Sequence, residues 1–220
     1  MSQQDKTAEY TMKKLLLFLV VVFAMFSCEK DSLNESELQL PGSISIHVGD
    51  LYNLSSSDNL ICSNKFVAEA NSGTIKGMHV GQCTVSCGNK QCKVTVAANH
   101  TLYLEPLCYS GLTKDKVISL YGQPDRVSSD GTVIGYETGL SYAPIITYLF
   151  ENGSFKCSSV QVEKSYLDEL KIHLQERYYY LQYSDGWYTY IDAYESAKMT
   201  KFVMYKSYNS SYYAVMYQPS

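Results

Sequence analysis

The sequence predicts an all-β sandwich followed by an α+β domain in which two helices pack on a mostly antiparallel sheet. Three observations lead to this fold class. Short, alternating apolar segments separated by glycine turns fill residues 40–98. Helix signals then occur twice within residues 101–220, each time followed by strand patterns. Two strand-rich stretches in this second part also align with each other.

The first 27 residues have the pattern of a secretory signal. Two lysines precede an apolar block, residues 15–26, which is too short for a bilayer core that needs about 20 residues. The small residue Ser27 ends the block, as expected before a cleavage site. Met12 is then expected to be the natural start of translation. A buried core helix is the alternative, and the polar residues after Cys28 argue against it.

The residues around this end carry a resemblance. Met25, Phe26 and Ser27 precede Cys28 and Glu29. The stretch resembles a bacterial lipoprotein signal, in which a lipobox ends in cysteine, although Met25 and Phe26 depart from the common residues. The resemblance implies cleavage before Cys28 and its acylation, and several acyl chains anchor a protein far more firmly than one. The residue after Cys28 is Glu29 and not the aspartate linked with retention in the inner membrane, so the resemblance favours the outer membrane. The stretch "EKDS" (29–32) also resembles surface-export signals of some Gram-negative lineages.

Residues 28–39 are polar and charged without apolar periodicity, which predicts a lipidated tether. The first folded domain is expected at residues 40–98. Ile44, Ile46 and Val48 alternate along one face of a strand. The stretch "CTVSCGNKQCKVTV" predicts a hairpin that turns at "GNK".

This domain resembles the bacterial Ig-like group 2 domain. The stretches that carry the resemblance are "SIHVGDLYNL" and "SNKFVAEANSGTIKGMHVGQCTVSCGNKQCKVTV". The matching positions are Gly49, Val67, Ala68, Gly73, Gly77, Gly81, Val94 and Val96. A tryptophan that is usual near Ile61 is missing. The resemblance implies an Ig-like sandwich that acts as a spacer or adhesive module on a bacterial surface, and it names no ligand.

Six cysteines follow Cys28, and their even number permits disulfides in an exported protein. They are Cys62, Cys83, Cys87, Cys92, Cys108 and Cys157. Cys87 and Cys92 flank the hairpin turn and form a possible disulfide, while buried free thiols are the alternative. The spacing does not match a zinc site, so no metal is expected.

The second domain, residues 101–220, begins with helix signals in "GLTKDKVISLYGQPD". Thr113 is the expected N-cap, Gly122 the stop, and the apolar face comprises Val117, Leu120 and Tyr121. A second helix is expected in "SYLDELKIHLQERYYYL", with a capping box formed by Ser165 and Asp168. Its apolar positions are Leu167, Leu170, Leu174 and Tyr178.

Strands are expected in "TVIGYET", in "GWYTYIDAY" and in two longer stretches that each form a hairpin. These are "ITYLFENGSFKCSSVQVE" (146–163) and "KFVMYKSYNSSYYAVMYQ" (201–218), which align with each other and predict a tandem α-then-β repeat. The repeat resembles small outer-membrane assembly lipoproteins and β-lactamase-inhibitor-type proteins. The matching residues are Gly111, Val117, Gly122, Pro124, Phe150 and Gly153. The resemblance implies protein binding or scaffolding and carries over no catalytic residue.

Tyrosine is unusually frequent, with 21 residues, of which 19 follow position 100. Strand alternation places Tyr188 with Tyr190, and Tyr213 with Tyr217, on shared faces. These four residues form a candidate binding face for a protein or glycan, because aromatic surfaces favour such partners. The alternative is that tyrosine is simply a good strand former on a half-wet sheet.

The net charge of −4 gives no electrostatic case for a nucleic acid partner. The motifs of serine hydrolases, zinc proteases and P-loop enzymes are absent from the sequence, and no two histidines have metal-ligand spacing. We therefore expect a non-catalytic, surface-exposed outer-membrane lipoprotein without a cofactor, which binds a protein or glycan through its C-terminal sheet. A periplasm-facing scaffold of an envelope assembly is the alternative.

Overall fold

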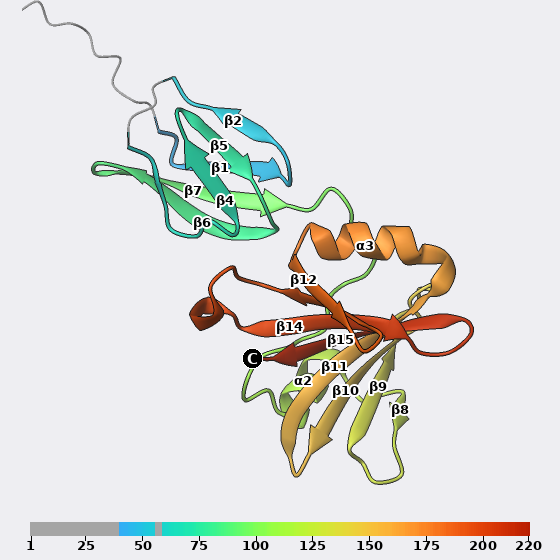
Figure 1. Cartoon of the computed structure of the whole chain (residues 1–220). Coiled ribbons are helices and arrows are strands. Elements are labelled where there is room, and N and C mark those ends of the chain that lie inside the picture. The colour runs from blue at the N-terminus through green and yellow to red at the C-terminus, as the bar shows by residue number, and fades with distance from the viewer. Residues whose placement is uncertain (1–39, 56–58) are drawn as a thin grey trace, which may run out of the picture. The chain divides into compact units, whose positions relative to one another are not determined.

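The computed structural model describes residues 40–55 and 59–220, which fall within one compact unit, Leu38–Ser220. These residues are mostly in β-strands, and two segments among them are α-helices (Figure 1). A β-rich fold with few helices is therefore confirmed. The signal segment (1–27) and the tether with Cys28 (28–39) lie outside the described residues.

Residues 43–97 form two small sheets. The larger sheet has the strand order β1-β7-β6-β3, and the smaller has the order β2-β5-β4. β1 runs parallel to β7, and the other neighbours are antiparallel. The strands are β1 (Ser43–His47), β2 (Leu51–Asn53), β3 (Ile61–Cys62), β4 (Ala68–Asn71), β5 (Thr74–Gly77), β6 (Gly81–Cys87) and β7 (Lys90–Ala97).

Both sheets contribute to one apolar core, because alternate residues of each strand point inward. The predicted hairpin is confirmed as β6 and β7, which turn at Gly88 and Asn89. Ile46 on β1 and Ile75 on β5 are buried in the same core. The buried residues of the hairpin are Cys83, Val85, Cys92, Val94 and Val96.

Gly77 lies at a close approach between the two sheets. A Cβ at this position would come 2.4 Å from the carbonyl oxygen of His47 and 3.1 Å from a methyl of Val96. The oxygen belongs to the backbone at the end of β1, and Gly49 N–H donates to the Gly77 carbonyl at 2.8 Å. The strand therefore requires glycine here because no side chain fits against this backbone.

The C-terminal part is one eight-stranded antiparallel sheet with two helices, as predicted. Its strand order is β12-β13-β14-β15-β11-β10-β9-β8. The helices are α2 (Lys114–Tyr121) and α3 (Leu167–Gln175), with short 3₁₀ turns at Lys164–Tyr166 and Ser196–Lys198. The strands are β8 (Arg126–Val127), β9 (Val133–Glu137), β10 (Ile145–Glu151), β11 (Ser154–Glu163), β12 (Tyr179–Ser184), β13 (Trp187–Ile191), β14 (Lys201–Ser207) and β15 (Tyr212–Pro219).

The sheet has an internal two-fold arrangement. α2 is followed by the meander β8 to β11, and α3 by the meander β12 to β15. The last strands of the two meanders, β11 and β15, pair antiparallel at the middle of the sheet. Val160 lies directly opposite Val215 in this pair, and these two valines occupy the same position in the aligned stretches 146–163 and 201–218. The predicted tandem α-then-β repeat agrees with this topology.

Both helices pack on the same face of the sheet. Opposed residues of neighbouring strands share a face, and one transverse row of such residues crosses six strands. The row is Ile134, Tyr148, Ser158, Tyr217, Val203 and Tyr190, and all six are buried. Val117 of α2 packs at one end of this face, and Leu170 and Leu174 of α3 pack at the other.

Three details of the predicted helices are wrong. α3 ends at Gln175, so Tyr178 and Leu181, which were expected in the helix, lie beyond it. α3 has Tyr166 as its N-cap residue without a side-chain cap, so the capping box of Ser165 and Asp168 does not form. In α2, Thr113 caps the helix as predicted, but Leu120 and Tyr121 are exposed although they were expected on the apolar face. The helix has only eight residues, and Val117 is the residue that it buries.

Replacing Gly77 with alanine should destabilise the protein by about 1–3 kcal/mol, because the new Cβ would overlap the His47 carbonyl and force backbone movement. Urea unfolding measures the change. Gly42→Ala is the matched control, since nothing lies within 4 Å of a Cβ there. Equal stability of the two variants would contradict the close approach.

Candidate functional site

The four tyrosines that were predicted to form a binding face lie on one face of the sheet, but it is the face that the helices cover. Val203 on β14 lies opposite Tyr190 on the neighbouring strand β13 and opposite Tyr217 on the other neighbouring strand, β15. The exposed fractions of the two tyrosines are only 3% and 0%. Tyr188 is 37% exposed and Tyr213 is half-buried. The prediction of an exposed face of four tyrosines is therefore wrong for Tyr190 and Tyr217.

Burial keeps the phenol groups of Tyr190 and Tyr217 protonated. The hydroxyl groups of Tyr217 and Tyr103 share a hydrogen bond of 2.8 Å inside the core. Desolvation raises the pKa of Tyr217 well above its ordinary value and that of Tyr190 to about 12. Both phenols are therefore neutral structural groups. A period of two predicts which residues share a face, but not which face the helices cover.

A continuous row of tyrosine rings leads from this core to the edge of the sheet. We call Tyr183, Tyr188, Tyr205 and Tyr213 the tyrosine row. Tyr183 lies opposite Tyr188, and Tyr188 lies opposite Tyr205. The ring centroids of these pairs are 4.7 Å and 4.6 Å apart, and the second pair is stacked. Tyr205 meets Tyr213 edge-on at 5.7 Å.

The exposure of the rings falls from Tyr183 through Tyr188 to Tyr205, and Tyr213 beyond it is half-buried. Tyr183 is 58% exposed, whereas Tyr205 is fully buried. Each ring contact contributes about 0.5–1.5 kcal/mol beyond the area that it buries. The outer rings are therefore held by the inner ones and meet a partner with little loss of side-chain freedom.

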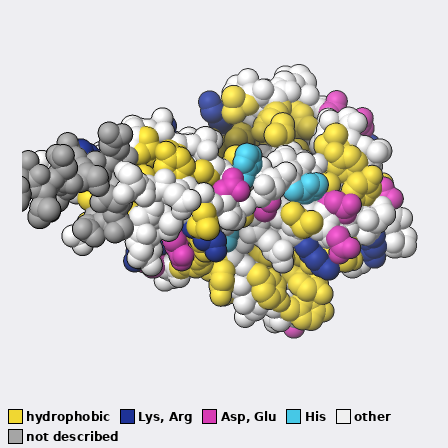
Figure 2. Space-filling view, turned by 90° about the horizontal axis from the view of Figure 1, so that it is seen from above, with side chains coloured by type: hydrophobic (Ala, Val, Ile, Leu, Met, Phe, Trp, Pro, Cys, Tyr) yellow, Lys and Arg dark blue, Asp and Glu magenta, His cyan; other side chains and the backbone are white. Residues whose placement is uncertain are grey.

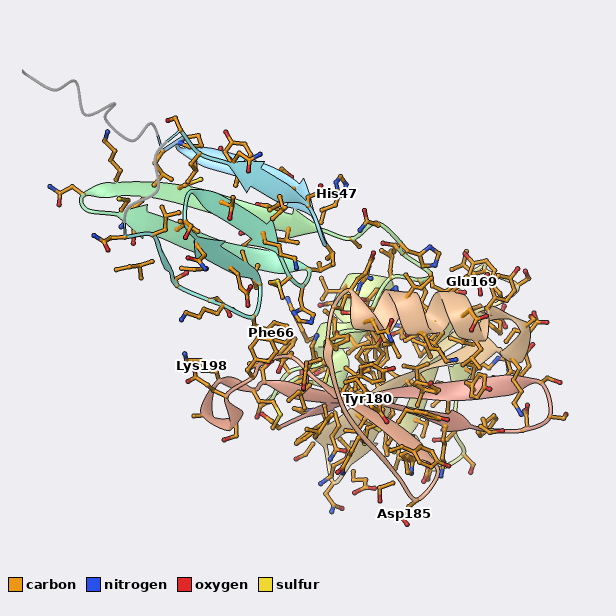
Figure 3. The ribbon with its side chains drawn as sticks, turned by 45° about the horizontal axis from the view of Figure 1, so that its top comes forward. His47, Phe66, Glu169, Tyr180, Asp185 and Lys198 are labelled. Carbon is orange, nitrogen blue, oxygen red and sulfur yellow. The ribbon has the colours of Figure 1, made fainter. Side chains whose placement is uncertain are left out.

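The outer end of the row belongs to β12, an edge strand of the sheet. All six of its residues are exposed, and three of them besides Tyr183 are large and apolar: Tyr179, Tyr180 and Leu181. Figure 3 shows Tyr180 on this strand and Asp185 at the tip of the following turn. The pairing with β13 shifts register between Tyr180 and Gln182, so Leu181 is an extra, bulged residue.

The sequence interpretation missed β12 because the residues after α3 continue its apolar spacing. The overlooked signal was Asp185–Gly186, a dipeptide typical of tight hairpins. Both residues have positive φ, 52° and 81°, as such a turn requires. Recognising this turn would have placed a strand before it and brought Tyr183 next to Tyr188.

A second cluster surrounds the carboxylate of Glu105. The Tyr178 hydroxyl donates to both of its oxygens at 2.7 Å. Lys201 Nζ and Arg177 Nε lie 3.8 Å and 3.9 Å from it. Arg177 also donates to the carbonyl oxygens of His100 and His173, at 3.0 Å and 2.9 Å. These contacts fix the segment 100–105 against the end of α3, which is a structural role.

His173 lies under this cluster and is fully buried. The Leu102 N–H donates to its Nδ1 at 3.2 Å, so the ring proton is on Nε2, which lies 3.8 Å from Glu105 Oε1. Desolvation, with smaller contributions from Arg177 and His100, lowers the pKa of His173 to about 3. The imidazole is therefore neutral at physiological pH.

The remaining sequence-predicted sites stay predictions. In the β6–β7 ladder, Cys87 lies opposite Lys90 and Cys92 opposite Val85, so the two cysteines share a face and are offset by two residues. Cys28 lies outside the described residues. Within residues 40–55 and 59–220, no group of three or more histidine, cysteine, aspartate or glutamate side chains is arranged to hold a metal ion.

Comparison of the chain with protein-family models, with curated proteins and with solved structures gives no match. Among the described residues, no helix is long and apolar enough to cross a membrane. The surface in Figure 2 carries hydrophobic side chains in separate patches, with charged and histidine side chains between them. The exposed residues of β12 and the tyrosine rings in contact with them make the tyrosine row and this edge strand the candidate site.

The low pKa of His173 predicts a loss of stability in acid. In the unfolded chain this group titrates near 6.5, but in the folded protein near 3. Between these values the unfolded chain binds a proton that the folded protein excludes, so the contribution is full above pH 6.5 and is lost as the pH falls toward 3. From pH 7 to 5 the loss should be about 2 kcal/mol.

Urea unfolding of wild type and His173→Gln at pH 7 and 5 measures this loss. The variant should lack the His173 share of the pH dependence, whatever its absolute stability, while the buried His79, whose pKa burial also lowers, keeps its own share. His47→Gln is the control, because His47 has a side chain that is 56% exposed. A pH dependence that survives in full in His173→Gln would show that other groups cause it.

Proposed function

We propose that the protein is a non-catalytic, lipid-anchored binding protein of the outer membrane, which holds an extended segment of a partner protein at the tyrosine row. The observation that carries this proposal is the exposed edge strand β12 with a row of tyrosine rings in contact behind it. The anchor is proposed from residues 13–28, where a short apolar block ends at Cys28.

Two properties of the edge favour a protein partner. An edge strand offers unpaired backbone donors and acceptors to which an extended peptide adds as another strand. Tyrosine contributes large contact area at low cost in conformational entropy, because its side chain has few rotatable bonds. Tyr183 and Tyr188 would supply this area beside the added strand. A glycan would use the rings but not the backbone groups.

In this proposal, residues 40–98 act as a spacer between the lipid anchor and the binding edge. Its two small sheets enclose a core of their own, as expected of an Ig-like sandwich of the group 2 type. Residues 40–98 and 101–220 would then be separate domains joined to the lipid by residues 28–39. A spacer of this kind displays the binding edge away from the membrane.

Replacing Cys28 with serine should release the protein from the membrane fraction or leave it unprocessed, because the thiol that accepts the lipid is gone. Cys108→Ser is the control and should stay anchored. Fractionation and the intact mass of the mature chain measure both effects. Unchanged acylation and anchoring of Cys28→Ser would refute the assignment.

Protease treatment of intact cells that carry the wild-type protein should remove residues 101–220 if the protein faces the cell surface. Full protection of these residues would favour the periplasmic scaffold.

Replacing both Tyr183 and Tyr188 with alanine should weaken partner binding at least about tenfold, since buried aromatic anchors dominate such interfaces. The partner is first trapped in intact cells with a photo-crosslinking residue at position 183, and its affinity for purified variants is then measured. Tyr109→Ala and Tyr208→Ala are controls, because both side chains are exposed outside the row.

A protein adduct at position 183, with none at position 208, is expected. Absence of an adduct at position 183, or full affinity of the double variant, would contradict the proposal. Binding to a glycan array that is lost in the double variant would assign the same surface to a sugar.

A further inference from the structure

Two thiols from distant parts of the sequence meet in the larger N-terminal sheet. Cys62 on β3 and Cys83 on β6 are 21 residues apart, and their sulfur atoms lie 3.5 Å from each other. A disulfide bond is about 2.05 Å long. The sulfurs therefore need to approach by roughly 1.5 Å for the bond to form.

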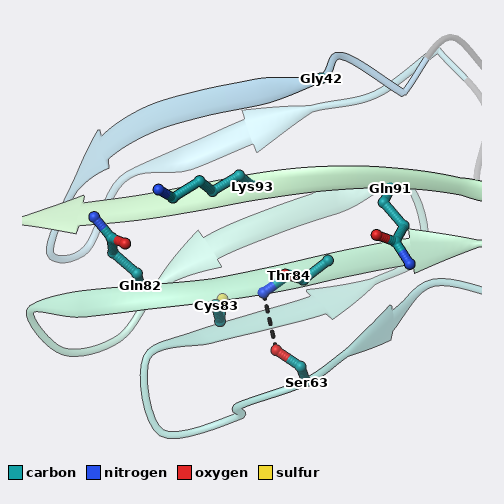
Figure 4. Close-up of a pocket in the computed structure, with 7 residues that line it drawn as sticks. All are labelled: Gly42, Ser63, Gln82, Cys83, Thr84, Gln91 and Lys93. Carbon is teal, nitrogen blue, oxygen red and sulfur yellow. Dashed lines mark hydrogen bonds between the residues drawn. The ribbon is translucent and has the colours of Figure 1, made fainter.

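The backbone beside the two sulfurs is held in place. Ser63 N–H donates to the Thr84 carbonyl at 2.9 Å, and Thr84 N–H donates to the Ser63 hydroxyl at 2.9 Å. Figure 4 shows this second bond next to Cys83. Ser63 and Thr84 directly follow Cys62 and Cys83 in the chain, so their hydrogen bonds fix the separation of the two cysteine backbones.

The two thiols differ in access. Cys62 is half-buried and lines a surface hollow of about 500 Å³ together with Lys65 and Glu69, whereas Cys83 is buried. The hydrogen bond with Cys83 lowers the pKa of Cys62, and the positive charge of Lys65 adds to this effect. The same hydrogen bond, with desolvation, raises the pKa of Cys83. Cys62 is therefore the more accessible and more acidic thiol, and Cys83 is the resolving thiol.

We propose that Cys62 and Cys83 form a redox modification site that closes to a disulfide by exchange with a disulfide donor, such as a dithiol oxidoreductase. The Cys62 thiolate attacks one donor sulfur, which forms a mixed disulfide and releases the other donor sulfur as a thiolate. Cys83 then loses its proton and attacks the Cys62 sulfur, which releases the second donor thiolate. Two electrons and two protons pass to the donor, which leaves as a dithiol.

The bond has a structural consequence. β3 contains only Ile61 and Cys62, and it is an edge strand that pairs with β6 alone. The disulfide ties this short strand to the centre of the sheet. It also closes a loop that contains β4 and β5 of the other sheet, and such a closed loop restricts the unfolded chain. Oxidation is therefore expected to stabilise the N-terminal part.

Cys92 is the competing partner for Cys83. It is buried on β7, which pairs with β6, and belongs to the same apolar core as Cys83. In the ladder Cys62 and Cys92 both lie opposite Val85, so each is offset by two residues from Cys83 and register does not separate the two pairings. Access separates them, because Cys92 is fully buried, whereas Cys62 is half-buried and lines the surface hollow. A bond between Cys83 and Cys92 is an outcome that the test separates.

The test uses the mature chain with Cys28→Ser, equilibrated with mixtures of oxidised and reduced glutathione. Free thiols are alkylated, and digestion with mass spectrometry identifies linked peptides. A Cys62–Cys83 peptide is expected, together with a rise in Tm of roughly 5–10 °C on oxidation. Cys62→Ser and Cys62→Ala should lose both effects, while Cys157→Ser, which changes another half-buried thiol, should keep them.

Several results would overturn the proposal. They are the absence of this linked peptide over the whole redox series, a predominant Cys83–Cys92 peptide, and an equal thermal shift in Cys62→Ser. Cys62 is half-buried, so its replacement by serine or alanine avoids the folding defect that a change at Cys83 risks. The site is independent of the tyrosine row, and partner binding is not needed for any readout.

Discussion

The pairing of β11 with β15 is the contact on which the C-terminal part depends. Six residue pairs centred on Val160 and Val215 join the two repeats, and every other pair of neighbouring strands in the sheet lies within one repeat. Because both valines are fully buried, a slip of one residue between the strands would turn the inward side chains of one repeat outward relative to those of the other. The shared face for α2 and α3, and the location of the free edges, follow from this single register.

The abundance of tyrosine follows largely from the way this core is built. A tyrosine ring fills space like phenylalanine, but its hydroxyl group must find a partner when it is buried. Tyr217 finds Tyr103, Tyr178 finds Glu105, and Tyr148 accepts from the Leu107 N–H at 3.3 Å. The sequence pattern cannot separate these buried tyrosines from the exposed ones, because both kinds occur at alternate positions along the strands.

Local features of the fold were predictable from sequence. The two ends of α2 were predicted correctly at Thr113 and Gly122. A capping hydroxyl and a terminating glycine act on the adjacent helical turn, so the local sequence is enough to recognise them. Alignment of the two repeats already placed Val160 and Val215 at equivalent positions. Long-range features were not predictable. The coverage of Tyr190 and Tyr217 depends on the side of the sheet toward which the chain turns after β11, which alternation does not record. β12 was missed because its tyrosines satisfy helical spacing as well.

The two edges of the eight-stranded sheet differ, and this difference limits how copies of the protein can associate. β12 has six residues, whereas β8 has two, and Arg126 of β8 is engaged with Glu137 at 2.9 Å. A strand of two residues with a charged side chain is a poor template for further pairing. Two copies could join through β12, but such a pair would present β8 at both outer ends. Growth would stop at two, so a high local concentration would not turn this sheet into a fibre.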